Sequence, residues 1–152
     1  MSESVALPRT YRPLGTRMVS GVATIALVGV LGFLWFMLPA HVRSDFGWFQ
    51  RVTLIAVFAC MVGLLNALFR TRARADEQGL TIINGYRTHR YEWAEIVSIS
   101  LSANRPWALI DLADGTTAVV MALQTSDGER ASRSARELAD VIAGHSPTDR
   151  GE

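Results

Sequence analysis

The sequence predicts a membrane α-hairpin followed by a small α+β domain. Two long stretches, residues 18–38 and 52–69, are predominantly apolar and contain no charged residue. Beyond residue 75, apolar and polar residues alternate, as they do in strands with one solvated face. Near the end of the chain, apolar residues recur at helical intervals instead. Strands followed by one amphipathic helix are typical of an antiparallel unit in which the helix covers the sheet.

The two apolar stretches have the length of membrane-spanning helices. As helices they would extend about 31 Å and about 27 Å, close to the ~30 Å thickness of the hydrocarbon layer. A basic start before an apolar run can also indicate a cleaved signal peptide. The first run is long for that role, and Leu38-Pro39-Ala40 is a poor cleavage site. We therefore expect two transmembrane helices.

Arginines flank the hairpin unequally and predict its orientation. The connecting loop 39–51 carries two arginines and Asp45, whereas the outer flanks carry six arginines. The positive-inside rule then predicts a multi-pass protein of the cell membrane with both termini cytoplasmic, residues 1–17 as a disordered tail and 39–51 as a short extracytoplasmic loop. The six arginines either only set this topology or also contact anionic lipid head groups. They are Arg9, Arg12, Arg17, Arg70, Arg72 and Arg74.

The second apolar stretch has one face of small residues, which spans roughly 120° of a helical wheel. Small residues let helices approach closely, so this face is expected to pack against the first helix or against another copy of the protein. Asn66 lies at the depth of Ser20 and Thr24 and is expected to hydrogen-bond one of them, the alternative being an ion or substrate path. The face comprises Ala56, Ala59, Cys60, Gly63, Asn66 and Ala67.

Five strands are expected in the domain predicted at 75–145. Two of them flank Asn84-Gly85, a dipeptide favoured in two-residue hairpin turns because both positions accept φ > 0. Two others flank Asp114-Gly115 in a second hairpin. Between the hairpins, apolar residues alternate with serines. The strands are expected at residues 80–83, 86–91, 97–101, 107–112 and 116–121.

One amphipathic helix is expected to close the domain. Ser126 and Glu129 have the spacing of a capping box, and apolar residues repeat at helical intervals from Ala131 to Ile142. Gly144 is expected to end the helix. Residues 146–152 are predicted to be a polar tail.

Three strings stand out in the domain: Gly79–Asn84 (GLTIIN), Tyr91–Ile96 (YEWAEI) and Leu112–Gly115 (LADG). With the C-terminal helix they resemble the bacterial pleckstrin-homology-like (PH) domains, in particular the type found in actinobacterial membrane proteins such as the low-molecular-weight antigen proteins. The resemblance covers about residues 70–143. It implies a bent, partly open barrel of antiparallel strands with a helix plugging one end. Five strands are fewer than the seven of eukaryotic members.

The resemblance does not imply phosphoinositide binding. In eukaryotic members, a basic loop between the first strands holds the inositol phosphates. Here the corresponding turn is taken to be Asn84-Gly85, which is too tight to wrap a head group. The nearest basic residues, Arg87, His89 and Arg90, form either a solvated strand face or a ligand site.

No catalytic, cofactor or metal site is indicated. The three histidines, His41, His89 and His145, fall in separate regions, and Cys60 is the only cysteine. Glu92 and Glu95 flank Trp93 and are expected to cap a turn rather than form an acid pair. A net charge of +1 argues against nucleic-acid binding.

The function predicted from these residues is non-enzymatic. We expect a membrane-anchored PH-like module that binds another protein, with Tyr86, Arg87, His89 and Arg90 as the contact surface. The alternatives are a module that senses anionic lipids and an accessory subunit of a transporter. The transporter alternative lacks an intramembrane charge. A homo-oligomer is compatible with each of them.

Overall fold

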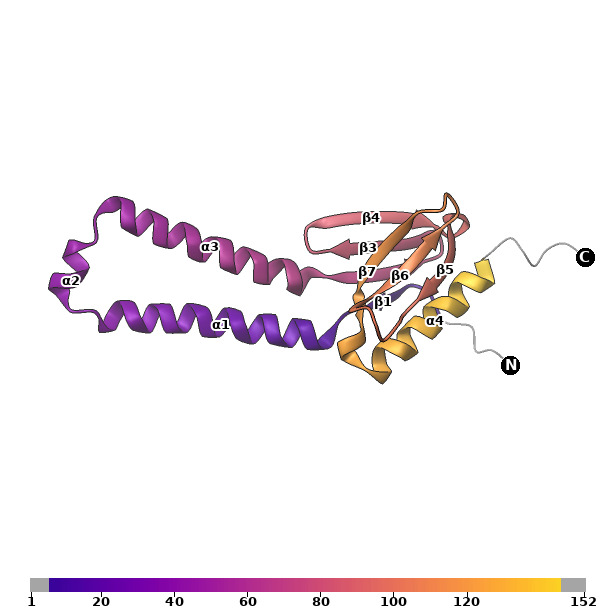
Figure 1. The fold of residues 1–152 in the computed structure, drawn as a ribbon, viewed down its shortest axis with the longest axis horizontal. Coiled ribbons are helices and arrows are strands. Elements are labelled where there is room, and N and C mark those ends of the chain that lie inside the picture. The colour runs from indigo at the N-terminus through magenta and orange to yellow at the C-terminus, as the bar shows by residue number, and fades with distance from the viewer. Residues whose placement is uncertain (1–5, 146–152) are drawn as a thin grey trace, which may run out of the picture. The chain divides into compact units, whose positions relative to one another are not determined.

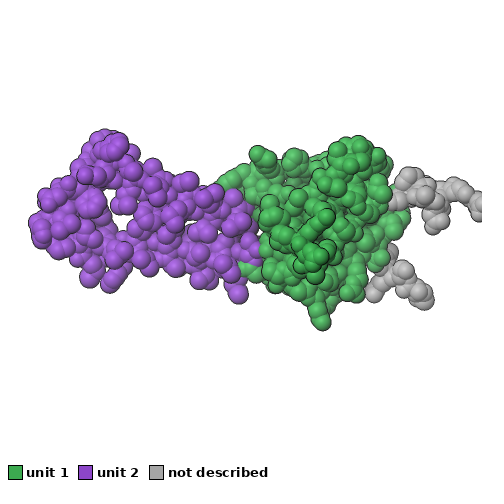
Figure 2. All heavy atoms as spheres, viewed as in Figure 1, with its two compact units in different colours: residues 1–15, 70–152 green, residues 16–69 purple. Residues whose placement is uncertain are grey.

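The computed structural model describes residues 6–145, which form two compact units. One unit, Thr16–Phe69, is a helical hairpin, and the other combines the segment before it with the segment that begins at Arg70 (Figures 1 and 2). The elements are β1 (Arg9–Tyr11), α1 (Leu14–Met37), α2 (Ala40–Asp45), α3 (Trp48–Arg70), β2 (Arg72–Asp76), β3 (Gly79–Asn84), β4 (Arg87–Glu92), β5 (Ile96–Ser100), β6 (Trp107–Leu112), β7 (Thr117–Gln124) and α4 (Glu129–His145).

Helices α1 and α3 contain the two predicted membrane segments, and each is long and apolar enough to cross a bilayer. Both begin about four residues earlier than predicted. Helix α1 ends at Met37 because Leu38, which precedes Pro39, is disfavoured in helical conformation. The predicted loop 39–51 contains the short helix α2. Large apolar side chains such as Ile25 and Ile55 are exposed, as expected for surfaces that contact lipid.

The two long helices of the hairpin pack loosely against each other. A hollow of about 670 Å³ with apolar walls lies between α1 and α3, and Figure 2 shows openings in this unit. Gly32 of α1 and Ala59 of α3 line the hollow. A side chain on Gly63 would meet no atom within 4 Å. Packing of the small-residue face, against the first helix or against another copy of the protein, stays a prediction.

The hydroxyl groups of α1 bond within their own helix. Ser20 Oγ donates to the carbonyl of Arg17 at 3.2 Å, and Thr24 Oγ1 donates to the carbonyl of Ser20 at 2.8 Å. Such bonds satisfy hydroxyl donors inside an apolar environment. Both hydroxyl oxygens can still accept a hydrogen bond, so the expected bond from Asn66 stays a prediction.

The other unit contains seven strands in two antiparallel sheets, in the orders β1-β2-β3-β4 and β5-β6-β7. The sheets do not close into a barrel, which confirms the predicted partly open form. The expectation of five strands is wrong, because the short strands β1 and β2 were not recognised. The prediction of a disordered tail at 1–17 is also wrong for Arg9–Tyr11, which form β1, and for the following residues, which begin α1 at Leu14.

Strand β1 pairs with β2 although the entire hairpin lies between them in the chain. Thr10 is paired with Arg74, and Tyr11 with Ala73. The helical hairpin is thus an insertion between two neighbouring strands of one sheet. The predicted domain boundary at residue 75 is too late, because β2 begins at Arg72 and β1 precedes the hairpin.

The hairpin turn between β3 and β4 differs by one residue from the prediction. Asn84 is the last residue of β3 and is paired with Arg87, so Gly85 and Tyr86 form the turn. Gly85 has φ +65°, as the first turn position of a type II′ hairpin requires. Asn84 instead joins the two sheets: its amide donates to the carbonyl of Val119 at 2.7 Å and accepts from the N–H of Met121 at 3.1 Å.

The second predicted hairpin is confirmed. Residues 113–116 connect β6 and β7, and Gly115 has φ +83°. The Asp114 carboxylate accepts from both the backbone N–H and the hydroxyl of Thr116, at 2.8 and 2.7 Å. These bonds lower the pKa of Asp114, because they stabilise its charged form.

Helix α4 covers the sheets but starts differently from the prediction. Gly128 with φ +58° precedes it, and Ser126 Oγ contacts the Gln124 side chain at 3.4 Å, so the expected capping box with Glu129 does not form. Asp127, which lies just before α4, contacts the start of α1 instead. Its carboxylate accepts hydrogen bonds from the N–H groups of Leu14 and Gly15 at 3.2 and 3.3 Å. It thereby caps the first turn of α1. Helix α4 ends at His145 rather than at Gly144.

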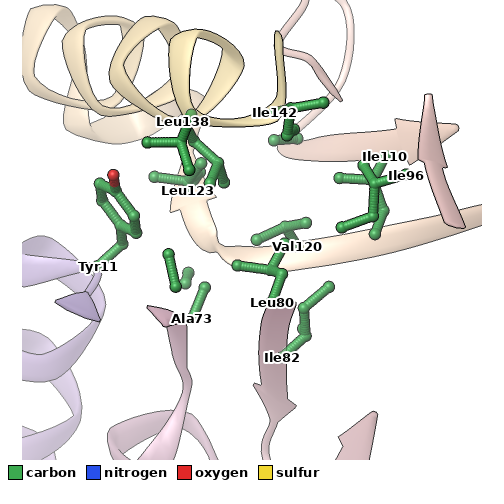
Figure 3. Close-up of a cluster of buried hydrophobic side chains, with 14 of the residues drawn as sticks. Tyr11, Ala73, Leu80, Ile82, Ile96, Ile110, Val120, Leu123, Leu138 and Ile142 are labelled. Atoms are coloured by element: carbon green, nitrogen blue, oxygen red, sulfur yellow. The ribbon is translucent and has the colours of Figure 1, made fainter. Parts of the chain in front are cut away.

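The core lies between the two sheets and α4 (Figure 3). Leu80 and Ile82 from β3 meet Ile110 from β6, Val120 from β7 and Leu138 from α4, and each is at most 1% exposed. These positions follow the alternation of the strands and the apolar repeat of the helix, which is why the sequence predicts them.

Trp93 and Ile96 anchor the corner between β4 and β5. Trp93 is 5% and Ile96 2% exposed, and Trp93 Nε1 donates to the carbonyl of Asp76 at 2.9 Å. Glu92 and Glu95 form a capping box around this corner, so the expectation that they cap a turn is confirmed. The tryptophan therefore ties the corner to the end of β2.

Tyr11 brings the N-terminal strand into this core. Its ring is 5% exposed, and burial, followed by the negative charge of Glu137, raises its pKa to about 12. Its hydroxyl has no hydrogen-bond partner among the described residues. Burying a hydroxyl without a partner costs free energy, so the ring rather than the hydroxyl stabilises β1 in the sheet.

Substitution of Tyr11 separates these two contributions. Tyr11→Ala should lower the free energy of unfolding of the domain by about 3 kcal/mol, since it empties a ring-sized volume in the core. Tyr11→Phe should leave stability unchanged or raise it, because it removes only the unpartnered hydroxyl. Thermal or denaturant unfolding of the full chain in detergent measures both. Equal losses in the two variants would contradict the assignment of Tyr11 to the core.

Candidate functional site

Four arginines gather on the outer face of the first sheet, and we call this surface the arginine face. Alternation along β2 buries Ala73 and Ala75 and leaves Arg72 and Arg74 exposed on the opposite side. Arg74 is paired with Thr10 on β1 and with Thr81 on β3, and Thr81 is paired with Arg90 on β4. The arginine face comprises Arg12, Arg72, Arg74 and Arg90.

The arginine face is hollowed. A cavity of about 330 Å³ opens on it, lined by the four arginines together with Thr10, Thr81, Asp76 and Ile83. It is therefore a polar hollow with four guanidinium groups, two hydroxyl groups and one carboxylate in its wall.

Asp76 is the one carboxylate of this hollow, and it serves the turn between β2 and β3. Its Oδ1 accepts from the backbone N–H groups of Gln78 and Gly79 at 3.0 and 3.1 Å. The same oxygen lies 3.7 Å from Arg90, whose guanidinium also donates to the Gln78 side chain at 2.6 Å. Among the described residues, Arg12, Arg72 and Arg74 have no ion-pair partner.

The six arginines predicted to contact lipid head groups do not form one cluster. Arg12, Arg72 and Arg74 lie on the arginine face. Arg9 instead pairs with Glu137 at 3.1 Å. Arg17 and Arg70 each stack on an aromatic ring: Arg17 lies 4.4 Å from the ring centre of Phe69, and Arg70 lies 5.6 Å from that of Tyr86. From the sequence, Arg90 was expected on a different surface, and Thr10 and Thr81 carried no signal, because the pairing of β1 with β2 is not visible in the sequence.

The predicted protein-contact surface forms the open edge of the first sheet. Strand β4 pairs with β3 through six consecutive residue pairs and is the last strand in the order. Arg87, His89 and Arg90 are exposed along β4, and Tyr86 is 62% exposed at the preceding turn. His89 stacks on Tyr91 with 6.3 Å between the ring centres. The structure thus places all four predicted residues at one edge.

The other strands at sheet edges are shorter or covered. Strand β1 has three residues, β5 packs against α4, and β7 packs against β2, β3 and α4. Strand β4, by contrast, has both faces solvated over most of its length. It is therefore the most accessible edge of the described domain.

The hydrogen-bond pattern of the β3–β4 hairpin determines which backbone groups of β4 point away from β3. In a hairpin closed by a two-residue turn, the pair that flanks the turn is hydrogen-bonded, and bonded and non-bonded pairs then alternate. The backbone N–H and C=O of Thr88 and Arg90 therefore point away from β3. The N–H of Glu92, next in this series, donates to the Glu95 carboxylate at 2.8 Å, as this alternation requires.

The described residues were also searched for groups of side chains that could hold a metal ion. No group of three or more histidine, cysteine or acidic side chains that could hold a metal ion occurs within residues 6–145. His145 stacks on Trp93 with 5.1 Å between the ring centres, and its Nδ1 lies 2.8 Å from the carbonyl of Val141. Cys60 lies exposed on α3.

Comparison with protein families identifies the domain. The model of the bacterial PH domain matches residues 70–141, which include β2–β7 and most of α4. Residues 70–141 form a PH-like domain. The match begins where α3 ends, so it omits β1, the first strand of the PH domain's own sheet.

Relatives of the chain occur in mycobacteria. An uncharacterised protein of Mycobacterium tuberculosis and one of Mycobacterium bovis are each 29% identical over 98 residues, which cover 64% of this chain. The match also spans 64% of the length of each relative. No solved structure matches the chain. These relatives agree with the predicted actinobacterial type of PH-domain protein.

Proposed function

We propose that this protein is a membrane-anchored PH module that binds an extended segment of another protein along the edge of β4. The observation that carries the proposal is the open edge itself, which presents the outward backbone groups of Thr88 and Arg90. An extended peptide can add to such an edge as a further strand and satisfy these groups. Strand β4 pairs with β3 through six consecutive residue pairs without a register shift, so a partner strand can pair with β4 in regular register.

The side chains of this edge favour an acidic partner segment. Arg87 is exposed and has no ion-pair partner among the described residues, and His89 adds a second basic group. Positive charges along an edge oppose pairing with another basic strand, and they attract a strand with aspartate or glutamate at the facing positions. Specificity would come from these pairs and affinity from the backbone bonds.

The location of the module follows from the hairpin and its flanking arginines. We place both chain termini, and with them the PH domain, in the cytoplasm, because six arginines flank the outer ends of the hairpin and two lie in its loop. Reporter fusions at residue 45 and at residue 152 test this topology. A cytoplasmic reporter should be active at residue 152 and inactive at residue 45, and the reverse result would contradict it.

Thr88→Pro tests strand addition at β4. Proline removes the outward N–H of residue 88, and the bonds to β3 remain because proline is tolerated where the N–H faces solvent. Quantitative cross-linking and mass spectrometry on native membranes should show partner segments attached near β4 in the wild type. We expect Thr88→Pro to reduce these cross-links severalfold.

Thr88→Ala is the matched control, since it removes the same side chain and keeps the N–H. It should preserve the cross-links, and both variants should unfold at similar temperatures in detergent. Cross-links near β4 that survive equally in both variants would exclude strand addition at this edge. The absence of any protein cross-linked near β4 in the wild type would likewise contradict the proposal.

A further inference from the structure

We propose that the hollow between α1 and α3 is a binding site for a long-chain carboxylic acid. The apolar chain of this ligand lies between the two helices, and its carboxylate binds the guanidinium group of Arg51. The hollow belongs entirely to the helical hairpin. The proposed protein contact uses the edge of β4 in the other unit, so the two proposals stand independently.

The hollow has an apolar wall with one charge at its end near α2. Of the described residues that line it, Arg51 alone is charged, and the others are apolar side chains or glycine. The lining comes from residues 31–38 and 46–62, which surround the turn of the hairpin. A ligand with a long apolar part and a single acidic group at one end matches this distribution of apolar surface and charge.

The loop around α2 is held together while the helices beside it stand apart. Figure 1 shows α1 and α3 diverging toward α2. The Trp35 ring meets the Phe46 ring edge-on, with 5.8 Å between the ring centres and 71° between the planes. Arg51 Nε donates to the carbonyl of Phe46 at 2.9 Å, and Arg51 Nη2 donates to the carbonyl of Arg43 at 3.0 Å. The atoms that line the hollow therefore lack packing partners, and a ligand chain would supply them.

The hollow has the length of one acyl chain. Arg51 and Val62 are the first and last lining residues of α3, and their separation of eleven residues corresponds to ~16 Å along a helix. One leaflet of a bilayer contains ~15 Å of hydrocarbon, which is half of the whole layer. The volume of about 670 Å³ lies within the range of small-molecule sites. A ligand with one chain therefore fits the hollow, whereas a phospholipid would leave its second chain outside.

Arg51 is positioned to bind a carboxylate. Its guanidinium group carries five N–H groups, and two of them donate to the loop carbonyls. No ion pair of Arg51 occurs among the described residues. The carbonyl bonds fix the guanidinium plane, so the remaining N–H groups can bind both oxygens of a carboxylate in parallel. The apolar wall strengthens such a pair, because a lower dielectric constant increases the attraction between opposite charges.

Two glycines of α1 provide a matched test of the hollow. Gly32 lines it and Gly29 does not, and a Cβ atom added to either would meet no atom within 4 Å. A photoreactive long-chain fatty acid, added to membranes that contain the full-length protein, should label peptides that include residues 31–38 and 51–62. We expect Gly32→Phe to reduce this labelling severalfold, since the new ring occupies the hollow, and Gly29→Phe to leave it unchanged.

Competition against the same probe measures the contribution of the carboxylate. The unlabelled acid should displace the probe at least about tenfold more effectively than its methyl ester, which has the same chain and no charge. Arg51→Gln should remove this difference between acid and ester. Arg43→Gln is the control, since it changes a neighbouring arginine whose side chain does not line the hollow, and it should preserve the difference.

Three results would overturn the proposal. The first is equal labelling of Gly32→Phe and Gly29→Phe, and the second is a methyl ester that competes as well as the acid in the wild type. The third is labelling that rises without saturation as the probe is added, as expected for a hollow that exchanges freely with bulk lipid. If Gly32→Phe fails to enter the membrane, the competition and saturation measurements still decide, because both use the wild-type protein.

Discussion

The pairing of β1 with β2 is the constraint on which the rest of the molecule depends. The chain leaves the first sheet after Tyr11, forms the whole hairpin, and returns to the neighbouring strand at Arg72. Pro13 and Thr71, at the two junctions, are both buried, and Thr71 Oγ1 accepts from the N–H of Gly85 at 3.3 Å. The junctions are thus part of the domain core, and the domain's first sheet is complete only when both ends of the hairpin are in place.

This connectivity explains where the candidate sites lie. From the sequence alone, Asn84-Gly85 was taken to be the connection between the first two strands. The structure corrects this, because Asn84 lies in β3 and the connection between β1 and β2 is the membrane hairpin. The arginines that flank the hairpin therefore continue into β1 and β2 and emerge on the outer face of the sheet. The arginine face is therefore supplied by strands that lie on both sides of the hairpin in the chain.

The sequence predicts those features that depend on local patterns. Uncharged runs identify α1 and α3, alternation identifies β3–β7, and the repeat from Ala131 to Ile142 identifies α4. The buried residues Trp93 and Ile96 belong to the string Tyr91–Ile96 that carries the family resemblance. Features that depend on distant contacts could not be predicted: three residues give β1 no periodicity, and its partner lies beyond the hairpin. Asp127 likewise caps α1 across more than a hundred residues, and Arg90 joins Arg74 only through the sheet register.

The central claim, that the hairpin is inserted between two paired strands, is tested most directly by a disulfide across that pair. Thr10→Cys with Arg74→Cys, in a Cys60→Ala background, places two cysteines at directly paired positions on the exposed sheet face. Paired antiparallel residues have the Cα separation that a disulfide needs. Mild oxidation of the protein in native membranes should join them within one chain, seen as a faster-migrating monomer under non-reducing electrophoresis. Thr10→Cys with Thr117→Cys, on the other sheet, should not link. If the Thr10→Cys, Arg74→Cys variant forms no more disulfide than the Thr10→Cys, Thr117→Cys control, the insertion of the hairpin into the sheet is contradicted.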